Sequence, residues 1–302
     1  MSKGSSYHKP VLLQECIDGL KIDSEGVYVD VTFGGGGHSA AILEGLSGGR
    51  LVAFDQDFDA RSNVLHDDRF VLVGQNFRYL KNNLKMMGVG RVDGILADLG
   101  VSSHQFDQGD RGFSIRFDGV LDMRMNNLSG KSARDVVNDY EEDDLASVLW
   151  KYGEVRNSRL LARRIVQRRG VGVLNTVFEL RDVVLGCANK RKENQYLAQV
   201  FQALRIEVND EMKALEEMLV QAEEVLSVGG RLVVISYHSL EDRLVKNFMK
   251  KGKFFGEEEK DLYGNVIRPL RPVNTKVIVP GEQEILINGR ARSAKLRIAE
   301  KI

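Results

Sequence analysis

The chain has 302 residues, enough to bury one large hydrophobic core or two smaller ones. Lys and Arg together number 43, as do Asp and Glu, so the formal net charge is zero. This balance excludes a strongly basic protein that coats nucleic acid through bulk charge. A nucleic-acid partner would have to be held by local basic patches.

Cysteine and histidine usage and the amino terminus exclude further classes. Cys16, Cys187 and the scattered histidines form no Cys-x-x-Cys or His-x-His spacing, so we expect neither a disulfide framework nor a metal site. The polar start, residues 1–6, lacks a signal-like apolar core, and no apolar run is long enough to span a bilayer. We therefore expect a soluble, cytoplasmic protein with no membrane partner.

The first hundred residues alternate between helical and strand patterns. An amphipathic helix is predicted over 10–20. Runs of β-branched and aromatic residues predict a series of strands over 27–33, 50–55, 69–73 and 92–99. Strands that alternate with helices in this way indicate an α/β fold with a parallel sheet.

The first strand ends in a run of glycines. Gly34-Gly35-Gly36-Gly37-His38 follows it directly, and a helical segment comes next. Strand, glycine turn and helix form the first unit of a nucleotide-binding α/β fold. Because a Cβ would block close approach of a ligand to the main chain, the run favours a ligand site over a merely tight connection.

Two later strands end in acidic residues. Asp55 follows the second strand and Asp98 ends the fourth, while Phe77 follows the third. Asp55 is placed to accept the hydroxyls of a ribose, although an Asp that simply caps the next helix is the alternative. Since ligands of open α/β sheets lie at the carboxyl ends of the strands, we expect these residues and the glycine turn to converge on one cleft.

From residue 106 to 199 only helical periodicity is visible. Capping-box spacings occur at Ser132–Asp135 and Thr176–Glu179. We predict a helical domain over 106–199, inserted into a sheet domain made of 1–105 and 200–302.

This helical block contains the densest basic run of the chain. Spacings of four residues place Arg159 with Arg163, and Arg164 with Arg168, on shared helix faces. Two interpretations are open: a face that contacts RNA phosphates, or a solvated helix surface.

The sheet pattern returns near the carboxyl terminus. Helices are predicted over 201–208 and 210–226, then a strand over 231–237. In the segment that follows, Ser239 and Asp242 can cap the next helix. Two closing strands are predicted over 276–279 and 294–299. Basic residues around them form a second candidate RNA-facing patch: Arg268, Arg271, Arg290 and Arg292.

A glycine turn followed by an acid at the end of the next strand occurs in binding sites for dinucleotides and for S-adenosylmethionine. The turn does not follow Gly-x-Gly-x-x-Gly, since Ser39 holds the last position, and no Gly-Lys-Ser/Thr follows. An acid at the end of the fourth strand suits a neutral or cationic ligand and would repel a pyrophosphate. These observations favour S-adenosylmethionine over NAD.

Ordered motifs cover nearly the whole chain. They are Thr32-Phe33-Gly34 with Gly36-Gly37-His38-Ser39, Asp98-Leu99-Gly100-Val101-Ser102-Ser103-His104-Gln105, Arg111-Gly112-Phe113-Ser114, Leu121-Asp122-Met123-Arg124-Met125, Phe201-Gln202-Ala203-Leu204-Arg205-Ile206 and His238-Ser239-Leu240-Glu241-Asp242-Arg243. Together they resemble the bacterial 16S ribosomal RNA cytosine-N4 methyltransferase family, from about Tyr7 to Ala299.

The resemblance implies a Rossmann-like class I S-adenosylmethionine-dependent methyltransferase sheet with an inserted all-helical domain. It implies methyl transfer to the exocyclic N4 amine of a cytidine in the decoding region, with 16S ribosomal RNA or the small ribosomal subunit as partner. It also implies cofactor contacts: Gly36, Gly37 and His38 to the methionine part, Asp55 to the ribose, Phe77 to the adenine ring, Asp98 to the adenine edge or methionine end, and Gln105 to the remaining polar groups.

The exocyclic amine of cytosine is a weak nucleophile because its lone pair is delocalised into the ring. Catalysis must align that nitrogen with the methyl group and accept hydrogen bonds from its protons. Asp98, or the main-chain carbonyl of Leu99 or Gly100, is the candidate acceptor. Three further candidates have equally plausible structural roles: His238, Asp122 and Ser102.

The target base must be unpaired or flipped out of a helix. Aromatic side chains in the insert could stack on it or belong to the core: Phe106, Phe113, Phe117 and Tyr152. Two other functions stay open at this point, an NAD-dependent oxidoreductase and a non-catalytic RNA-binding assembly factor. The sequence does not decide between a monomer and a homodimer.

Overall fold

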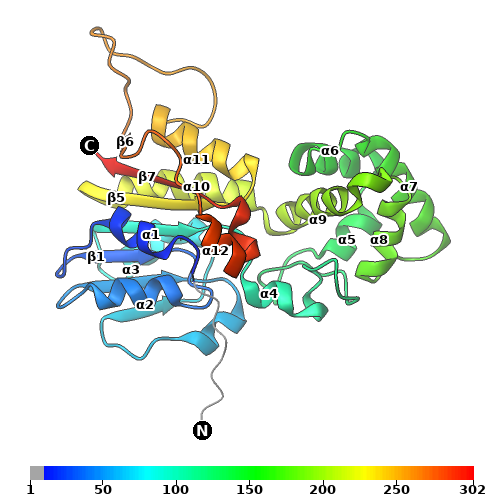
Figure 1. The fold of residues 1–302 in the computed structure, drawn as a ribbon, viewed down its shortest axis with the longest axis horizontal. Coiled ribbons are helices and arrows are strands. Elements are labelled where there is room, and N and C mark those ends of the chain that lie inside the picture. The colour runs from blue at the N-terminus through cyan, green and yellow to red at the C-terminus, as the bar shows by residue number, and fades with distance from the viewer. Residues whose placement is uncertain (1–9) are drawn as a thin grey trace. The chain divides into compact units, whose positions relative to one another are not determined.

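The computed structural model describes residues 10–302 and divides the chain into two units (Figure 1). The first unit comprises the chain up to Gly100 together with Met212–Ile302, and the second comprises Val101–Glu211. The polar start over 1–6 and the beginning of the family resemblance at Tyr7 lie outside the described residues. Within 10–302, no helix is long and apolar enough to cross a membrane.

The first unit is built on a seven-stranded sheet with the order β3-β2-β1-β4-β5-β7-β6. The strands are β1 (Val27–Asp30), β2 (Arg50–Phe54), β3 (Phe70–Val73), β4 (Val92–Asp98), β5 (Leu226–Ser236), β6 (Leu270–Pro272) and β7 (Lys295–Lys301). The first five pair in parallel, and β7 is antiparallel to both β5 and β6. This mixed sheet confirms the predicted Rossmann-like methyltransferase fold.

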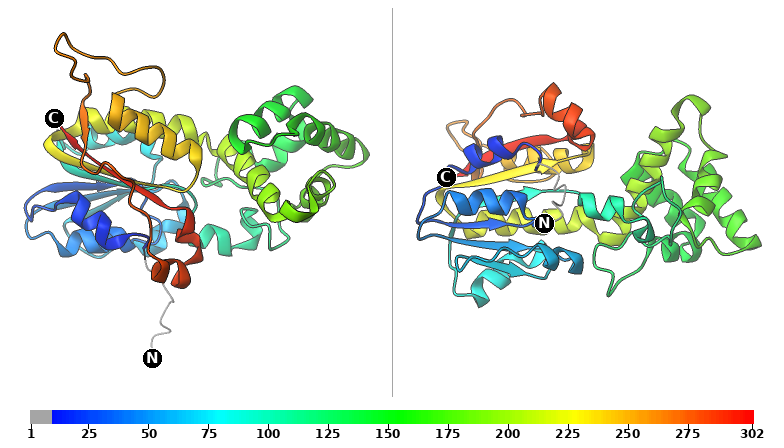
Figure 2. Two further views of the ribbon diagram at one scale, coloured as in Figure 1. Left: turned by 45° about the horizontal axis from the view of Figure 1, so that its top comes forward. Right: turned by 60° about the horizontal axis from the view of Figure 1, so that its bottom comes forward.

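Helices cover both faces of this sheet (Figure 2). They are α1 (Leu13–Leu20), α2 (Gly37–Glu44), α3 (Leu80–Met86), α10 (Glu211–Val225), α11 (Ser239–Lys251) and α12 (Glu282–Ile287). Neighbouring residues of β1 point to opposite faces, as in any strand. Tyr28 packs with Leu20 of α1 and Ile42 of α2, whereas Val29 lies in a second core with Leu215 of α10. The sheet is therefore buried on both sides, as parallel sheets are.

The strand predicted over 276–279 is wrong. Only Ile278 pairs there, through a single bridge to Leu296, and the outer edge of β7 is instead lined by β6. Between these two contacts the side chain of Asn274 accepts the N–H of Ile298 at 3.1 Å. The main chain still pairs at Val273, whose N–H donates to the Ile298 carbonyl at 2.9 Å, but the side chain of Asn274 then takes the hydrogen bond that a continuous strand would supply.

The second unit is helical. It contains α4 (Ser103–Asp107), α5 (Ala133–Asp139), α6 (Glu142–Gly153), α7 (Ser158–Val171), α8 (Val177–Leu185) and α9 (Glu193–Asn209). The domain boundaries predicted at 105/106 and 199/200 differ from the structural ones at 100/101 and 211/212. The later boundary is displaced because α9 is one continuous helix whose Leu197 and Leu204 both belong to the core of the helical unit.

Capping boxes start two helices where the sequence predicted them, at Ser132–Asp135 for α5 and Thr176–Glu179 for α8. The Thr176 hydroxyl accepts the N–H of Glu179 at 3.3 Å, and the Glu179 carboxylate accepts the N–H of Thr176 at 3.1 Å. Each box satisfies main-chain donors that the helix itself leaves unpaired.

Replacing Thr176 by Ala should lower the free energy of unfolding of the helical unit by about 1 kcal/mol, because the Glu179 N–H loses its acceptor. Trp150 of α6 is the single tryptophan of the chain, so its fluorescence in a urea titration reports on this unit. Thr176→Ser keeps the hydroxyl and should retain most of the stability. Equal losses for both variants would contradict the cap.

Candidate active site

The candidate site lies at the carboxyl ends of the parallel strands in the first unit. The strand order turns between β1 and β4, since β2 and β3 continue on one side and β5 on the other. Ligands of open α/β sheets bind at such a switch point. Asp30 ends β1, Asp98 ends β4, and Asp55 directly follows β2, so three carboxylates gather around this point.

The Asp30 carboxylate accepts hydrogen bonds from residues at both ends of the glycine turn. Its side chain is only 1% exposed. One oxygen, Oδ1, accepts the main-chain N–H of Thr32 at 3.0 Å, and the other, Oδ2, accepts the Ser39 hydroxyl at 2.7 Å. Burial raises the pKa of Asp30, while nearby His38 and these hydrogen bonds oppose that rise. Thr32 precedes the glycines and Ser39 follows them, so a single buried side chain fixes the turn.

The glycines of the turn are explained partly by the chain itself. Gly36 has a φ of 78°, in the left-handed region that favours glycine. A Cβ on Gly37 would lie 2.3 Å from Cγ of Pro10, so the close approach there is made by the protein's own chain. The glycines alone therefore do not require a ligand, and evidence for one must come from the surrounding carboxylates.

Asp55 lies against the glycine turn, as the sequence predicted. Its Oδ2 accepts the N–H of Gly34 at 2.8 Å, and its Oδ1 accepts the N–H of Asp57 at 2.8 Å. The short helical turn Phe58–Asn63 is capped by Asp57, so capping does not explain Asp55. Burial, outweighing the two hydrogen bonds, raises the pKa of Asp55 to about 6.

Asp98 is bonded through its main chain and its side chain. Its N–H donates to Oγ1 of Thr32 at 2.7 Å. The hydroxyl of Tyr237 donates to Oδ1 at 2.7 Å, and Nδ1 of His38 lies 3.7 Å from Oδ2. Burial raises the pKa of Asp98, and His38 and Tyr237 offset part of that rise. The other ring nitrogen of His38, Nε2, donates to the carbonyl of Val11 at 3.1 Å.

Phe77 and Gln105 are placed outside this hydrogen-bonded group. Phe77 follows β3 and packs, partly buried, against the core of the sheet. Gln105 belongs to the helical unit, is 4% exposed and forms a capping box with Ser102 at the start of α4. The cofactor contacts expected of these two residues remain predictions.

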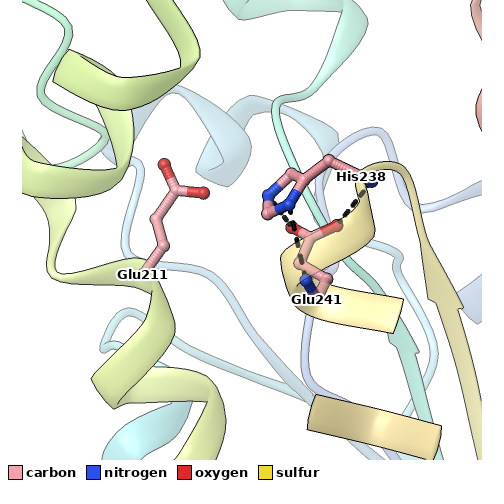
Figure 3. A group of neighbouring side chains, drawn as sticks. All are labelled: Glu211, His238 and Glu241. Atoms are coloured by element: carbon pink, nitrogen blue, oxygen red, sulfur yellow. Dashed lines mark hydrogen bonds and ion pairs between the residues drawn. The ribbon is translucent and has the colours of Figure 1, made fainter. Parts of the chain in front are cut away.

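The three further candidates for proton acceptor have structural roles. His238 is the N-cap of α11, its Nδ1 accepts the N–H of Glu241 at 3.4 Å, and its Nε2 lies 3.1 Å from the Glu241 carboxylate (Figure 3). Ser102 is the N-cap of α4. Asp122 forms an ion pair with Arg124, with their closest atoms 2.7 Å apart.

The sequence predicted Ser239 and Asp242 as caps of the helix after β5, and this prediction is wrong. His238 and Glu241 form the capping box of α11, and Ser239 is the first helical residue. Asp242 instead accepts a hydrogen bond from Nε of Arg297 in β7 at 2.7 Å, with Lys295 3.5 Å away. An imidazole can accept through an unprotonated ring nitrogen, which is why a histidine can occupy the cap position.

Two site residues were missed in the sequence, Asp30 and Tyr237. Asp30 could have been found, because it ends its strand with an acid just as Asp98 does. Tyr237 carries no such signal. It follows β5, and only the register that places Ile235 opposite Asp98 brings its hydroxyl to that carboxylate.

Some arginines of the basic face predicted on α7 are exposed, and others are partly buried and hydrogen-bonded within the protein. Arg159, Arg163 and Arg164 are exposed. Arg163 lies 3.5 Å from Glu142, an exposed pair of little energetic weight. Arg168 is partly buried and donates to the carbonyl of Gly172 at 2.9 Å, which helps end the helix.

The four aromatic residues considered for base stacking differ in burial. Phe113 lies in the helical core, and Phe106 and Tyr152 pack against it. Phe117 is 49% exposed. Of these four, Phe117 alone offers a largely open ring.

Together, the buried Asp30 and the partly buried Asp55 and Asp98 put three carboxylates at the carboxyl ends of neighbouring strands, with raised pKa values for all three. Such a set favours a ligand that carries positive charge and hydroxyl donors. S-adenosylmethionine has both, a sulfonium with an ammonium group and a ribose, so the residues present fit it. A pyrophosphate would be repelled.

Comparison with known proteins agrees with this chemistry. A model of the MraW methylase family matches residues 5–302. The chain belongs to the MraW methylase family. As a methylase of this family it takes S-adenosylmethionine as methyl donor, which confirms the predicted cofactor and removes the NAD-dependent alternative.

Individual relatives extend over almost the full chain. The ribosomal RNA small subunit methyltransferase H of Parabacteroides distasonis is 58% identical over 302 residues, covering 99% of both chains. The protein of the same name from Bacteroides fragilis is 57% identical over 298 residues, covering 98% of both. A solved rRNA methylase from Streptococcus thermophilus is 14% identical, with a TM-score of 0.42, covering 96% of this chain and 93% of that one.

The pKa of Asp55 gives a testable pH dependence. A ribose hydroxyl donates best to an ionised carboxylate, and this one protonates as the pH falls through about 6. The affinity for S-adenosylhomocysteine, measured by titration calorimetry, should therefore fall as the pH is lowered from about 8 to about 5.

The Asp55→Asn variant should bind S-adenosylhomocysteine more weakly at high pH, by roughly 1–3 kcal/mol, and should show a shallower loss on acidification. Asp68→Asn changes an exposed carboxylate of the same unit and should leave both properties unchanged. An Asp55→Asn variant with wild-type affinity and pH dependence would rule out the ribose role.

Proposed function

We propose that this chain transfers the methyl group of S-adenosylmethionine to the exocyclic N4 amine of a cytidine in the decoding region of 16S ribosomal RNA. The observation that carries the proposal is Asp98, a partly buried carboxylate held at the switch point of a methylase-family sheet. The names of the relatives support the small-subunit RNA as substrate. The motif resemblance supports the cytosine-N4 target and the decoding region.

For the cofactor we propose the following contacts. The main chain at Gly36 and Gly37, with His38, binds the methionine part, and Asp55 accepts the ribose hydroxyls. Phe77 packs on the adenine, Asp98 binds the adenine edge or methionine end, and Gln105 supplies remaining polar contacts. The hydrogen bonds of Asp30, which fix the turn that carries the glycines, support this assignment.

The protein's part in the chemistry is to orient the amine and accept its protons. S-adenosylmethionine, when bound, supplies an electrophilic methyl group. A carboxylate has about four acceptor positions. Asp98 can therefore accept the hydrogen bond from the Tyr237 hydroxyl and also one from an N–H of the target amine. Because burial raises the pKa of Asp98, it is a stronger base than an exposed aspartate. The main-chain carbonyls of Leu99 and Gly100 remain the alternative acceptors.

We further propose that the helical unit contacts the RNA through α7. The exposed Arg159, Arg163 and Arg164 support this, since charged groups that are not buried in ion pairs can neutralise phosphates. The partner is 16S ribosomal RNA or the small ribosomal subunit. The cytoplasmic location predicted from the sequence is where such a substrate occurs.

Incubation with labelled S-adenosylmethionine and small subunits from a strain lacking the gene tests the activity. We expect label in 16S RNA, and mass spectrometry of nuclease fragments should locate N4-methylcytidine in the decoding region. Label at another base would contradict the target. Binding of the RNA without transfer would favour the remaining alternative, a non-catalytic assembly factor.

Replacing Arg159 and Arg163 together by Gln should weaken RNA binding and reduce its salt dependence. Removal of two phosphate contacts should lower the slope of log K against log salt by about 1.4, at roughly 0.7 per contact for single strands. Filter binding at several salt concentrations measures this slope. Lys85→Gln alters an exposed lysine of the sheet unit and serves as the matched control. An unchanged slope would place the RNA contact elsewhere.

A further inference from the structure

Tyr237 is held at both ends beside the candidate site. Its main-chain N–H donates to Oε2 of Glu241 at 2.8 Å, and its hydroxyl donates to Oδ1 of Asp98 at 2.7 Å. Gly100 has a φ of 101°, and a Cβ built there would lie 3.4 Å from Cδ2 of the Tyr237 ring. The ring therefore packs close to the main chain just after β4, and its hydroxyl has a fixed direction.

We propose that Tyr237 is a positioning residue, whose hydroxyl holds the Asp98 carboxylate in the orientation and the ionised form that bind the methyl donor. The proposal rests on the proposed role of Asp98. It goes further by assigning a function to a tyrosine that the sequence motifs do not include. Tyr237 itself need not touch the donor.

A hydroxyl is suited to this task because it supplies a hydrogen bond without supplying charge. Burial, together with the adjacent Asp98, raises the pKa of Tyr237, so the phenol keeps its proton. A hydrogen bond donated to a carboxylate favours its ionised form, which burial otherwise disfavours. Tyr237 thus keeps Asp98 negative, whereas a cation in the same place would cancel the charge that attracts the donor.

The groups that face Asp98 come from several elements. His38 of α2 lowers its pKa, as does the hydroxyl of Tyr237, whereas Asp30 of β1 and Glu241 of α11 raise it. Loss of the Tyr237 hydroxyl leaves His38, at 3.7 Å, as the remaining stabilising side chain. The pKa of Asp98 should therefore rise, and the carboxylate should also be freer to rotate.

The test is Tyr237→Phe, which retains the ring and removes the hydroxyl. Titration calorimetry with S-adenosylhomocysteine should show an affinity roughly tenfold weaker near neutral pH, the usual scale for one hydrogen bond to a charged group. The loss should grow as the pH is lowered, because Asp98 then protonates at a higher pH than in the wild type. Tyr237→Phe should bind as tightly as the wild type at all pH values if the proposal is wrong.

A double-mutant cycle with Asp98→Asn separates positioning from general damage. If Tyr237 acts through Asp98, then Tyr237→Phe should cost little further affinity when Asp98 is already Asn. The same tenfold loss in both backgrounds would overturn the proposal while leaving the proposed function intact. A wild-type protein with no affinity for S-adenosylhomocysteine would overturn both.

Tyr28→Phe is the matched control. Tyr28 is another buried tyrosine of the sheet unit, and its hydroxyl accepts the main-chain N–H of Asp23 at 2.7 Å; the carboxylates that act on it are those of Asp93 and Asp23. This variant should keep wild-type affinity and pH dependence. A loss equal to that of Tyr237→Phe would show that any missing buried hydroxyl perturbs binding, and would overturn the specific role of Tyr237.

Discussion

The hydrogen bonds of Asp30 hold the end of β1, the glycine turn and the start of α2 in one arrangement. They also reach β4, because the Thr32 hydroxyl that lies 3.4 Å from Asp30 accepts the N–H of Asp98. A buried carboxylate is costly unless each oxygen is bonded, and here both are. The two strands that flank the switch point are thus joined by polar contacts just beyond their last main-chain pairing.

A second consequence is electrostatic. Fixing the turn places the Asp30 carboxylate in the interior, where its negative charge raises the pKa of both Asp55 and Asp98. Their partners are mostly neutral donors: main-chain N–H groups and the hydroxyls of Ser39 and Tyr237. These neutral partners add no positive charge of their own, which is the condition under which a cationic ligand contributes binding energy.

The strands of the parallel sheet and two carboxylates of the candidate site could be predicted from local patterns. Runs of β-branched residues located the strands of the parallel sheet, and acids at strand ends pointed to Asp55 and Asp98. The predictions that failed, and the residues that were missed, concern features set by contacts between residues far apart in the sequence. The run over 276–279 has strand composition, yet only Ile278 pairs with β7, because the side chain of Asn274 occupies the neighbouring N–H of Ile298. The contact of Tyr237 with Asp98 arises only from the pairing of β5 with β4. The continuity of α9 likewise depends on the helical core.

The polar contacts of the candidate site lie in one of the two units of the chain. The described hydrogen bonds that fix Asp30, Asp55 and Asp98 come from residues of the sheet unit, as do the largest causes of their pKa shifts. The helical unit has its own core and its own capped helices, and it carries the exposed arginines of α7. If α7 contacts RNA as proposed, its arginines can change without altering the hydrogen bonds of Asp30, Asp55 and Asp98, and Gln105 is the one proposed cofactor contact that the helical unit contributes.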